Sequence, residues 1–179
     1  MQYVALLRGI NVGGKNKVVM QELKACFEKL GFEQVLTYIN SGNIIFSTNE
    51  PEAGLVAKIE TCIKANLGLD IPVVVRSQKQ IADVVHALPE AWVNNSEVRT
   101  DVLFLWPEAD YPEVVQGIKT NPDLDELKYV PGALIWHVND RAQITKSKMR
   151  GFIGSRVYKL MTARNANTTR KLAELMGET

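Results

Sequence analysis

A glycine-rich stretch that ends in lysine is the first place where this sequence could do chemistry. Residues 9–16 read GINVGGKN and match the phosphate-binding pattern G-x-x-x-x-G-K through Lys15, but Asn16 stands where that pattern has serine or threonine. Backbone amides and the lysine of such a loop bind phosphate, and the missing hydroxyl would ligate Mg²⁺. The next two predicted strands form a hairpin, and no strand ends in the aspartate that Mg²⁺ requires. The sequence therefore argues against nucleotide hydrolysis and favours a looser anion-binding loop.

A second polar loop, residues 40–43 (NSGN), lies between two predicted strands. In a ferredoxin-like unit this hairpin loop and the loop after the first strand open at the same end of the sheet, so we expect one polar cluster that binds an anion. The alternative is that these residue types only serve turns and a helix entry. The candidate ligand-binding residues of the two loops are Arg8, Gly9, Asn11, Gly13, Gly14, Lys15, Asn40, Ser41 and Asn43.

A third polar segment, residues 162–168 (TARNANT), precedes the last predicted helix. A phosphate or carboxylate could lie at the N-terminus of that helix, with an arginine supplying bidentate hydrogen bonds. The alternative is a helix cap, with Asn167 as the expected cap residue and the arginine bonded to backbone carbonyls. The sequence does not say whether this segment faces the first cluster. Its candidate residues are Arg164, Asn165, Asn167 and Thr168.

Other chemistries have little support in the sequence. His86 and His137 are its only histidines, and it has no C-x-x-C or H-E-x-x-H pattern, so we expect no metal site. We assign no catalytic residue and no cofactor. Cys26 and Cys62 fall on the apolar stripes of two predicted helices, where reduced core thiols are expected.

Composition points to a globular protein, with 46% hydrophobic residues and a net charge of +1. The N-terminal apolar run is too short for a signal peptide, and no segment is long enough to cross a membrane, so we predict a cytoplasmic protein without a membrane partner. Charge is distributed unevenly: residues 77–140 hold eleven acidic and four basic side chains, whereas residues 141–173 hold nine Lys or Arg and no acid. This basic segment either attracts phosphates, nucleic acid or an acidic partner, or neutralises the acidic middle of the same chain.

The elements that must position the loops follow the order β-α-β-β-α-β, which is that of the ferredoxin-like unit. A linking helix comes next, the order then repeats, and a final helix ends at Gly177. The predicted class is α+β, with two ferredoxin-like halves (1–76 and 101–179) joined by a linking helix and loop (77–100). Strands are expected over 3–7, 35–39, 44–47, 71–75, 102–106, 127–130, 134–138 and 158–162, and helices over 19–30, 51–68, 77–88, 114–118, 149–156 and 167–177.

Three blocks, ALLRGINVGGKNKV, TYINSGNIIF and TARNANTTRKL, give the chain a resemblance over nearly its full length to a bacterial family of uncharacterised proteins, a domain-of-unknown-function group. The resemblance implies a paired ferredoxin-like fold and a shared site, but names no reaction or ligand. Carried onto this sequence, the family motif falls on Arg8, Gly9, Asn11, Gly13, Gly14, Lys15, Asn16, Asn40, Ser41, Gly42, Asn43, Thr162, Arg164, Asn165, Asn167 and Thr168.

Three classes of function remain open from the sequence. The leading hypothesis is a surface that binds a phosphorylated small molecule or nucleotide, with Arg8, Lys15 and Arg164 as charge partners. The second is a nucleic-acid-binding module that uses the basic segment, as some ferredoxin-like sheets bind RNA. The third is a regulatory or assembly domain without catalysis, whose oligomeric state the sequence does not reveal.

Overall fold

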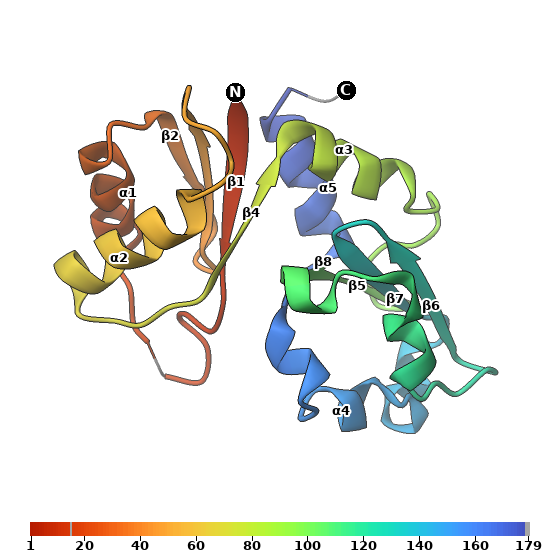
Figure 1. Cartoon of the computed structure of the whole chain (residues 1–179). Helices are drawn as coiled ribbons and strands as arrows, with labels where there is room; N and C mark the ends of the chain where they lie inside the picture. Colours follow the sequence, from red (N-terminus) through yellow and green to blue (C-terminus); the bar gives the residue numbers. More distant parts are fainter. Residues whose placement is uncertain (15, 178–179) are drawn as a thin grey trace. The chain divides into compact units, whose positions relative to one another are not determined.

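Two four-stranded antiparallel sheets with helices organise the chain, so the α+β class and the two ferredoxin-like halves are confirmed (Figure 1). The computed structural model describes residues 1–14 and 16–177 of the 179-residue chain. The chain divides into a first unit, Met1–Lys79 with the C-terminal residues from Glu174 on, and a second unit, Gln80–Ala173.

The first unit has the predicted β-α-β-β-α-β order, with its strands arranged β2-β3-β1-β4. Each neighbouring pair is antiparallel, and the two helices lie against the same face of the sheet (Figure 1). This is the arrangement of a ferredoxin-like unit. Its elements are β1 (Gln2–Leu7), α1 (Met20–Lys29), β2 (Glu33–Tyr38), β3 (Asn43–Ser47), α2 (Leu55–Leu67) and β4 (Val73–Ser77).

An aromatic cluster forms the core between this sheet and its helices. Phe46 of β3 contacts Phe27 of α1 and stacks on Phe32, with ring centroids 5.4 and 4.5 Å apart, respectively. The expected thiols, Cys26 and Cys62, are free and buried where α1 and α2 meet. Such apolar contacts stabilise the unit because they remove large side chains from water.

The second unit repeats the same sheet order as β6-β7-β5-β8, again with every neighbouring pair antiparallel. The repeat predicted from element order alone is thus present in the strands. Its elements are β5 (Arg99–Leu105), β6 (Asp125–Val130), β7 (Ala133–Val138) and β8 (Met161–Asn165), and the helices α3 (Gln78–His86) and α5 (Ala166–Leu175) come before β5 and after β8 in the sequence.

Short helical turns replace the long helices between the strands of the second unit. The predicted helix over 149–156 ends at Phe152, and the expected last strand over 158–162 begins only at Met161 because a 3₁₀ turn precedes it. Gly151 and Gly154 lie in this region, and glycine is unfavourable in a helix. The turns are η1 (Pro107–Ala109), η2 (Pro112–Gly117), η3 (Arg141–Lys146), α4 (Met149–Phe152) and η4 (Val157–Leu160).

One buried carboxylate attaches this irregular chain to the second sheet. Asp125 of β6 accepts hydrogen bonds from the backbone amides of Asn121 (2.8 Å) and Lys148 (2.9 Å), and from Trp136 Nε1 (3.2 Å). Met149 and Phe152 of α4 then cover the same face of the sheet. Side-chain contacts, rather than helix length, therefore hold the segment between β7 and β8 in place.

Candidate functional site

The two polar loops predicted to meet do lie together in the first unit. We call residues 8–18 the glycine loop and residues 39–43 the hairpin loop. The side-chain amide of Asn11 donates to the carbonyl of Asn40 (2.9 Å) in the hairpin loop and to the carbonyl of Val18 (3.0 Å), and its oxygen accepts from the Val18 amide (2.9 Å). Asn11 therefore uses its whole amide to join the two loops and to close the glycine loop.

A close backbone approach reinforces this junction at Gly42. Its carbonyl accepts a hydrogen bond from the Leu7 amide (2.9 Å). Gly42 has a φ of +76°, and a Cβ atom there would lie 2.7 Å from Ile10 Cδ1 and 2.8 Å from Leu7 Cβ. Only glycine lets the hairpin loop lie this close to the first strand.

Other predicted ligand residues in this cluster also have structural partners. Asn43 is fully buried and donates to the Tyr38 carbonyl and to Ser41 Oγ, both at 3.0 Å. Asn16 closes the glycine loop by donating to the Gly9 carbonyl at 3.0 Å. These contacts explain the polar residue types without a ligand.

The rest of the cluster is open to solvent. Gly9, Gly13 and Gly14 are exposed and left-handed, with φ values of +71°, +60° and +76°. The Asn40 side chain is exposed and makes no hydrogen bond with the residues that the structure describes. Arg8 is half-buried, and Lys15 lies outside the described residues.

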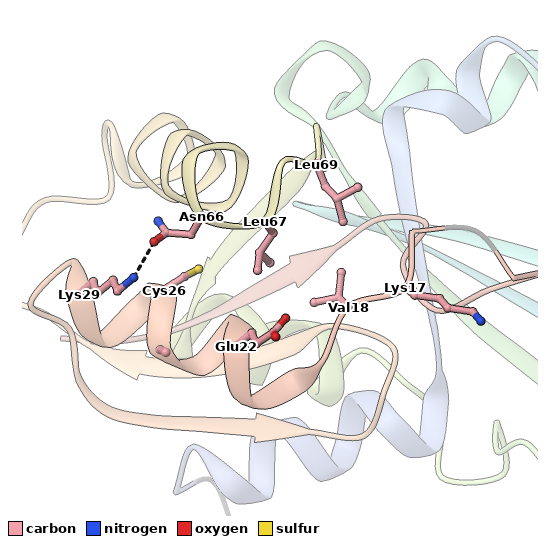
Figure 2. Close-up of a pocket in the computed structure, with 9 residues that line it drawn as sticks. Lys17, Val18, Glu22, Cys26, Lys29, Asn66, Leu67 and Leu69 are labelled. Carbon is pink, nitrogen blue, oxygen red and sulfur yellow. Dashed lines mark hydrogen bonds between the residues drawn. The ribbon is translucent and has the colours of Figure 1, made fainter.

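A cavity of about 390 Å³ lies where the glycine loop runs into α1 (Figure 2). Figure 2 shows the Glu22 side chain extending from α1 toward Val18, while Lys17 points away from the helix. On the other side, Lys29 Nζ donates to Asn66 Oδ1 at 2.6 Å. Charged groups of both signs therefore surround a partly apolar floor. The cavity is lined by Lys17, Val18, Glu22, Ala25, Cys26, Lys29, Asn66, Leu67 and Leu69.

Most of the residues that line this cavity could not be predicted from the sequence. Lys17 directly follows the glycine loop, which is a usable signal, but Glu22 and Lys29 read only as polar positions of an amphipathic helix. Asn66 comes from the end of α2 and meets them through the packing of two helices, which local spacing does not reveal.

The third predicted segment lies in the second unit, across β8 and α5. Arg164 is buried and donates to Thr162 Oγ1 (3.1 Å) and to the Ala163 carbonyl (2.8 Å), and burial lowers its pKa to about 10. The expected cap residue, Asn167, is wrong: Asn165 Oδ1 accepts from the Thr168 amide (2.8 Å), because α5 begins at Ala166.

Asn167 has a different structural partner. Its side chain accepts from the backbone amide of Asn94 (3.0 Å) and donates to the carbonyl of the same residue (2.8 Å). This pair of bonds ties the start of α5 to the segment before β5. Whether the third segment shares a ligand with the first two stays a prediction.

Part of the basic segment also has internal partners. Arg141 donates to Asn94 Oδ1 and to the Asn95 carbonyl, both at 2.8 Å. Arg170 donates to the carbonyls of Trp92 (3.0 Å) and Pro89 (2.8 Å). The guanidinium groups of these two arginines therefore have a structural role, because they hold the chain between α3 and β5 in place.

Residues 1–14 and 16–177 contain neither a metal-binding cluster nor a membrane-spanning helix. No group of three or more His, Cys, Asp and Glu side chains in this part of the chain could hold a metal ion. Across the same residues, every helix falls short of the length and apolar character needed to cross a bilayer.

Comparison with known proteins places the chain in a family. Residues 1–136 match the sequence profile of DUF1697, a family of proteins of unknown function. The chain belongs to this family. Among solved structures, it is similar to the conserved bacterial protein SP0830 from Streptococcus pneumoniae, with 30% identity and a TM-score of 0.84 over 98% of each chain. No curated protein matches it. The predicted membership of an uncharacterised bacterial family is therefore confirmed, and DUF1697 brings no named activity with it.

Proposed function

We propose that the first unit binds a small phosphorylated molecule, such as a sugar phosphate or nucleotide, where the glycine loop meets the cavity beside α1. The observation that carries this proposal is continuity: Lys17 and Val18, which end the glycine loop, also line the cavity. A phosphate on the loop and the rest of the ligand in the cavity would then be neighbours.

The loop side of this site suits the phosphate. Gly13 and Gly14 are exposed, so their backbone can approach an anion closely. Lys17 follows them in the same loop and points away from α1, where its ammonium can pair with phosphate oxygens (Figure 2). Asn11 holds this loop in a defined shape through its bonds to Val18 and Asn40, which reduces the entropy lost on binding.

The residues that line the cavity are suited to the hydroxylated part of such a ligand, for example a sugar. The Glu22 carboxylate accepts no hydrogen bond from the residues that the structure describes, so it can accept from sugar hydroxyls. The Lys29–Asn66 pair supplies donors on the opposite side, and Leu67 and Leu69 give an apolar surface for a ring. A ligand with both a phosphate and several hydroxyls satisfies all of these groups.

A thermal-shift comparison of matched ligands tests the proposal. Ribose 5-phosphate, glucose 6-phosphate and AMP would be compared with ribose, glucose and adenosine. We expect at least one phosphorylated ligand to raise the melting temperature while its unphosphorylated partner does not, because a ligand at about 100 times its Kd stabilises the folded state by about 2.7 kcal/mol.

Substitutions in the glycine loop and in the cavity test whether the ligand that raises the melting temperature binds there. Lys17→Ala and Lys15→Ala should abolish the shift, and Glu22→Gln should reduce it, each without lowering the melting temperature of the free protein. Lys24→Ala is the matched control, because Lys24 is a partly exposed lysine on α1 that pairs with Glu28 at 3.7 Å and lies outside the cavity lining. Failure of every phosphorylated ligand, or an equal shift in Lys17→Ala, would overturn the proposal.

A further inference from the structure

The second unit contains a cavity of its own, of about 360 Å³, at the start of β5. Two arginines, a threonine and three apolar residues line it. The lining residues are Arg99, Ile144, Thr145, Met149, Arg150 and Ile153.

Arg99 is oriented by a buried carboxylate. Its Nε donates to Asp101 Oδ2 at 2.7 Å, and the Asp101 side chain is only 10% exposed. Burial raises the pKa of Asp101, whereas the charges of Arg99 and Arg141 favour its ionised form. Because this contact uses only Nε, the two terminal amino groups of Arg99 are left without an acceptor among the residues that the structure describes.

Arg150 adds a second guanidinium to the same cavity. Its side chain is exposed and forms no ion pair with the residues that the structure describes. Thr145 lines the cavity as well. One partly satisfied arginine and one arginine without an acid partner therefore give the cavity an excess of positive charge.

The remaining wall is apolar. Ile144, Met149 and Ile153 come from the segment between β7 and β8, and Ile153 is 45% exposed although it is a large aliphatic residue. A fully hydrated inorganic anion would leave this surface in contact with water. A neutral apolar ligand would instead leave the guanidinium groups without acceptors, which is costly when water is displaced.

We propose that this cavity binds a small amphipathic carboxylate, an aliphatic or aromatic acid. Its carboxylate pairs with the guanidinium groups of Arg99 and Arg150, whose planar donors match carboxylate oxygens. Its apolar body packs against Ile144, Met149 and Ile153. This second site is independent of the function proposed for the first unit.

Titration calorimetry with matched probes tests this assignment. Octanoate is the probe. Octan-1-ol has a chain of the same length but a neutral hydroxyl in place of the carboxylate, and acetate and inorganic phosphate are anions without the apolar chain. We expect octanoate to bind at least about tenfold more tightly than each of the other three, since one charge-assisted contact corresponds to roughly tenfold or more in affinity. No octanoate binding, or equal binding of phosphate or octanol, would overturn the proposal.

Single substitutions then assign the site. Arg150→Gln should weaken octanoate binding about tenfold without changing the melting temperature, because the Arg150 side chain is exposed. Ile153→Ser should weaken octanoate but leave acetate unchanged. Lys148→Gln is the control, since this exposed lysine lies on the same segment outside the cavity lining. Octanoate binding that is equal in Arg150→Gln and in the wild type would place the ligand elsewhere and overturn the proposal.

Discussion

At the scale of single residues, asparagine side chains hold the candidate site together. Asn11 and Asn40 have the same side chain and lie in the two loops that meet, yet they differ in what they contact. Asn11 makes three hydrogen bonds, two with the backbone of Val18 and one with the carbonyl of Asn40, whereas the Asn40 side chain is exposed. The two residues therefore form a matched pair for experiment.

We expect Asn11→Ala to lower the free energy of unfolding by about 2–4 kcal/mol, at roughly 1 kcal/mol for each lost hydrogen bond, with a further cost because Asn11 has a φ of +53°. Asn40→Ala should change it by less than about 0.5 kcal/mol. Urea denaturation measures both. Equal effects would show that Asn11 does not join the loops.

His137 is a second residue whose surroundings have a measurable consequence. It is buried on β7, its Nδ1 lies 2.8 Å from Thr100 Oγ1, and its ring stacks on Trp92 with centroids 4.7 Å apart. Burial lowers the pKa of His137 below 6.5, although the nearby Glu126 opposes this shift.

Because the folded protein binds the proton on His137 less readily than the unfolded chain, the free energy of unfolding should fall as the pH drops below about 6.5 and through the lowered pKa. Above pH 6.5 the residue is neutral in both states and contributes no slope. Denaturation between pH 7.5 and 5.5 measures the effect, and His137→Gln should flatten it. An unchanged slope in that variant would assign the pH dependence to other groups.

The residue types of the site could be predicted from the sequence better than their roles. For Asn11, Ser41 and Asn43 the sequence predicts either ligand binding or a role in turns; the structure shows hydrogen bonds that fit the second role, and ligand binding stays a prediction. Both roles use the same donors and acceptors. The role of such a side chain depends on which backbone groups lie near it. The sequence does not reveal these neighbours, since Asn11 and its partner Asn40 are 29 positions apart.

At the scale of elements, the contact between the hairpin loop and the first strand depends on Gly42. We expect Gly42→Ala to lower the free energy of unfolding by about 2–4 kcal/mol, because a methyl group would overlap Ile10 and Leu7 in a left-handed backbone. Gly13→Ala is the control: it has a similar φ but no atom within 4 Å of its Cβ position, so we expect a loss of about 1 kcal/mol. Similar losses in chemical denaturation would rule out the close approach.

The helices of the first unit, and α3 and α5, could be predicted from the sequence, whereas the short turns between β7 and β8 could not. The apolar periodicity of residues 19–30 predicts a helix, and α1 extends from Met20 to Lys29. In the second unit, contacts such as those of Asp125 with Asn121 and Lys148 hold short turns that have no period of their own. The contact of Asp125 with Lys148 joins residues 23 positions apart, so local patterns do not reveal it.

At the scale of the whole molecule, the order of elements was enough to predict two ferredoxin-like halves, because short connections allow few antiparallel arrangements. Charge distribution was less informative. Nine basic residues in 141–173 suggested an anion-binding tail, but Arg141, Arg164 and Arg170 donate hydrogen bonds to the protein itself.

We therefore expect the chain to bind single-stranded oligonucleotides weakly, through fewer than about three phosphate contacts. Affinity should then fall by less than about tenfold between 50 and 200 mM salt, because each phosphate contact contributes a slope of about −0.7 on a logarithmic scale. Fluorescence anisotropy with a labelled oligonucleotide measures this slope. A much steeper fall would favour the nucleic-acid-binding alternative.

The short turns between β7 and β8 also predict where the folded chain opens first. Helical turns of four to six residues are marginal by themselves, so local opening should cost less here than in α1 or α2. The exposed basic residues Lys146, Lys148, Arg150 and Arg156 make this segment a substrate for trypsin. Brief digestion should therefore cut between residues 146 and 156 before it cuts elsewhere, and an acid bound beside Arg150 would slow that cut.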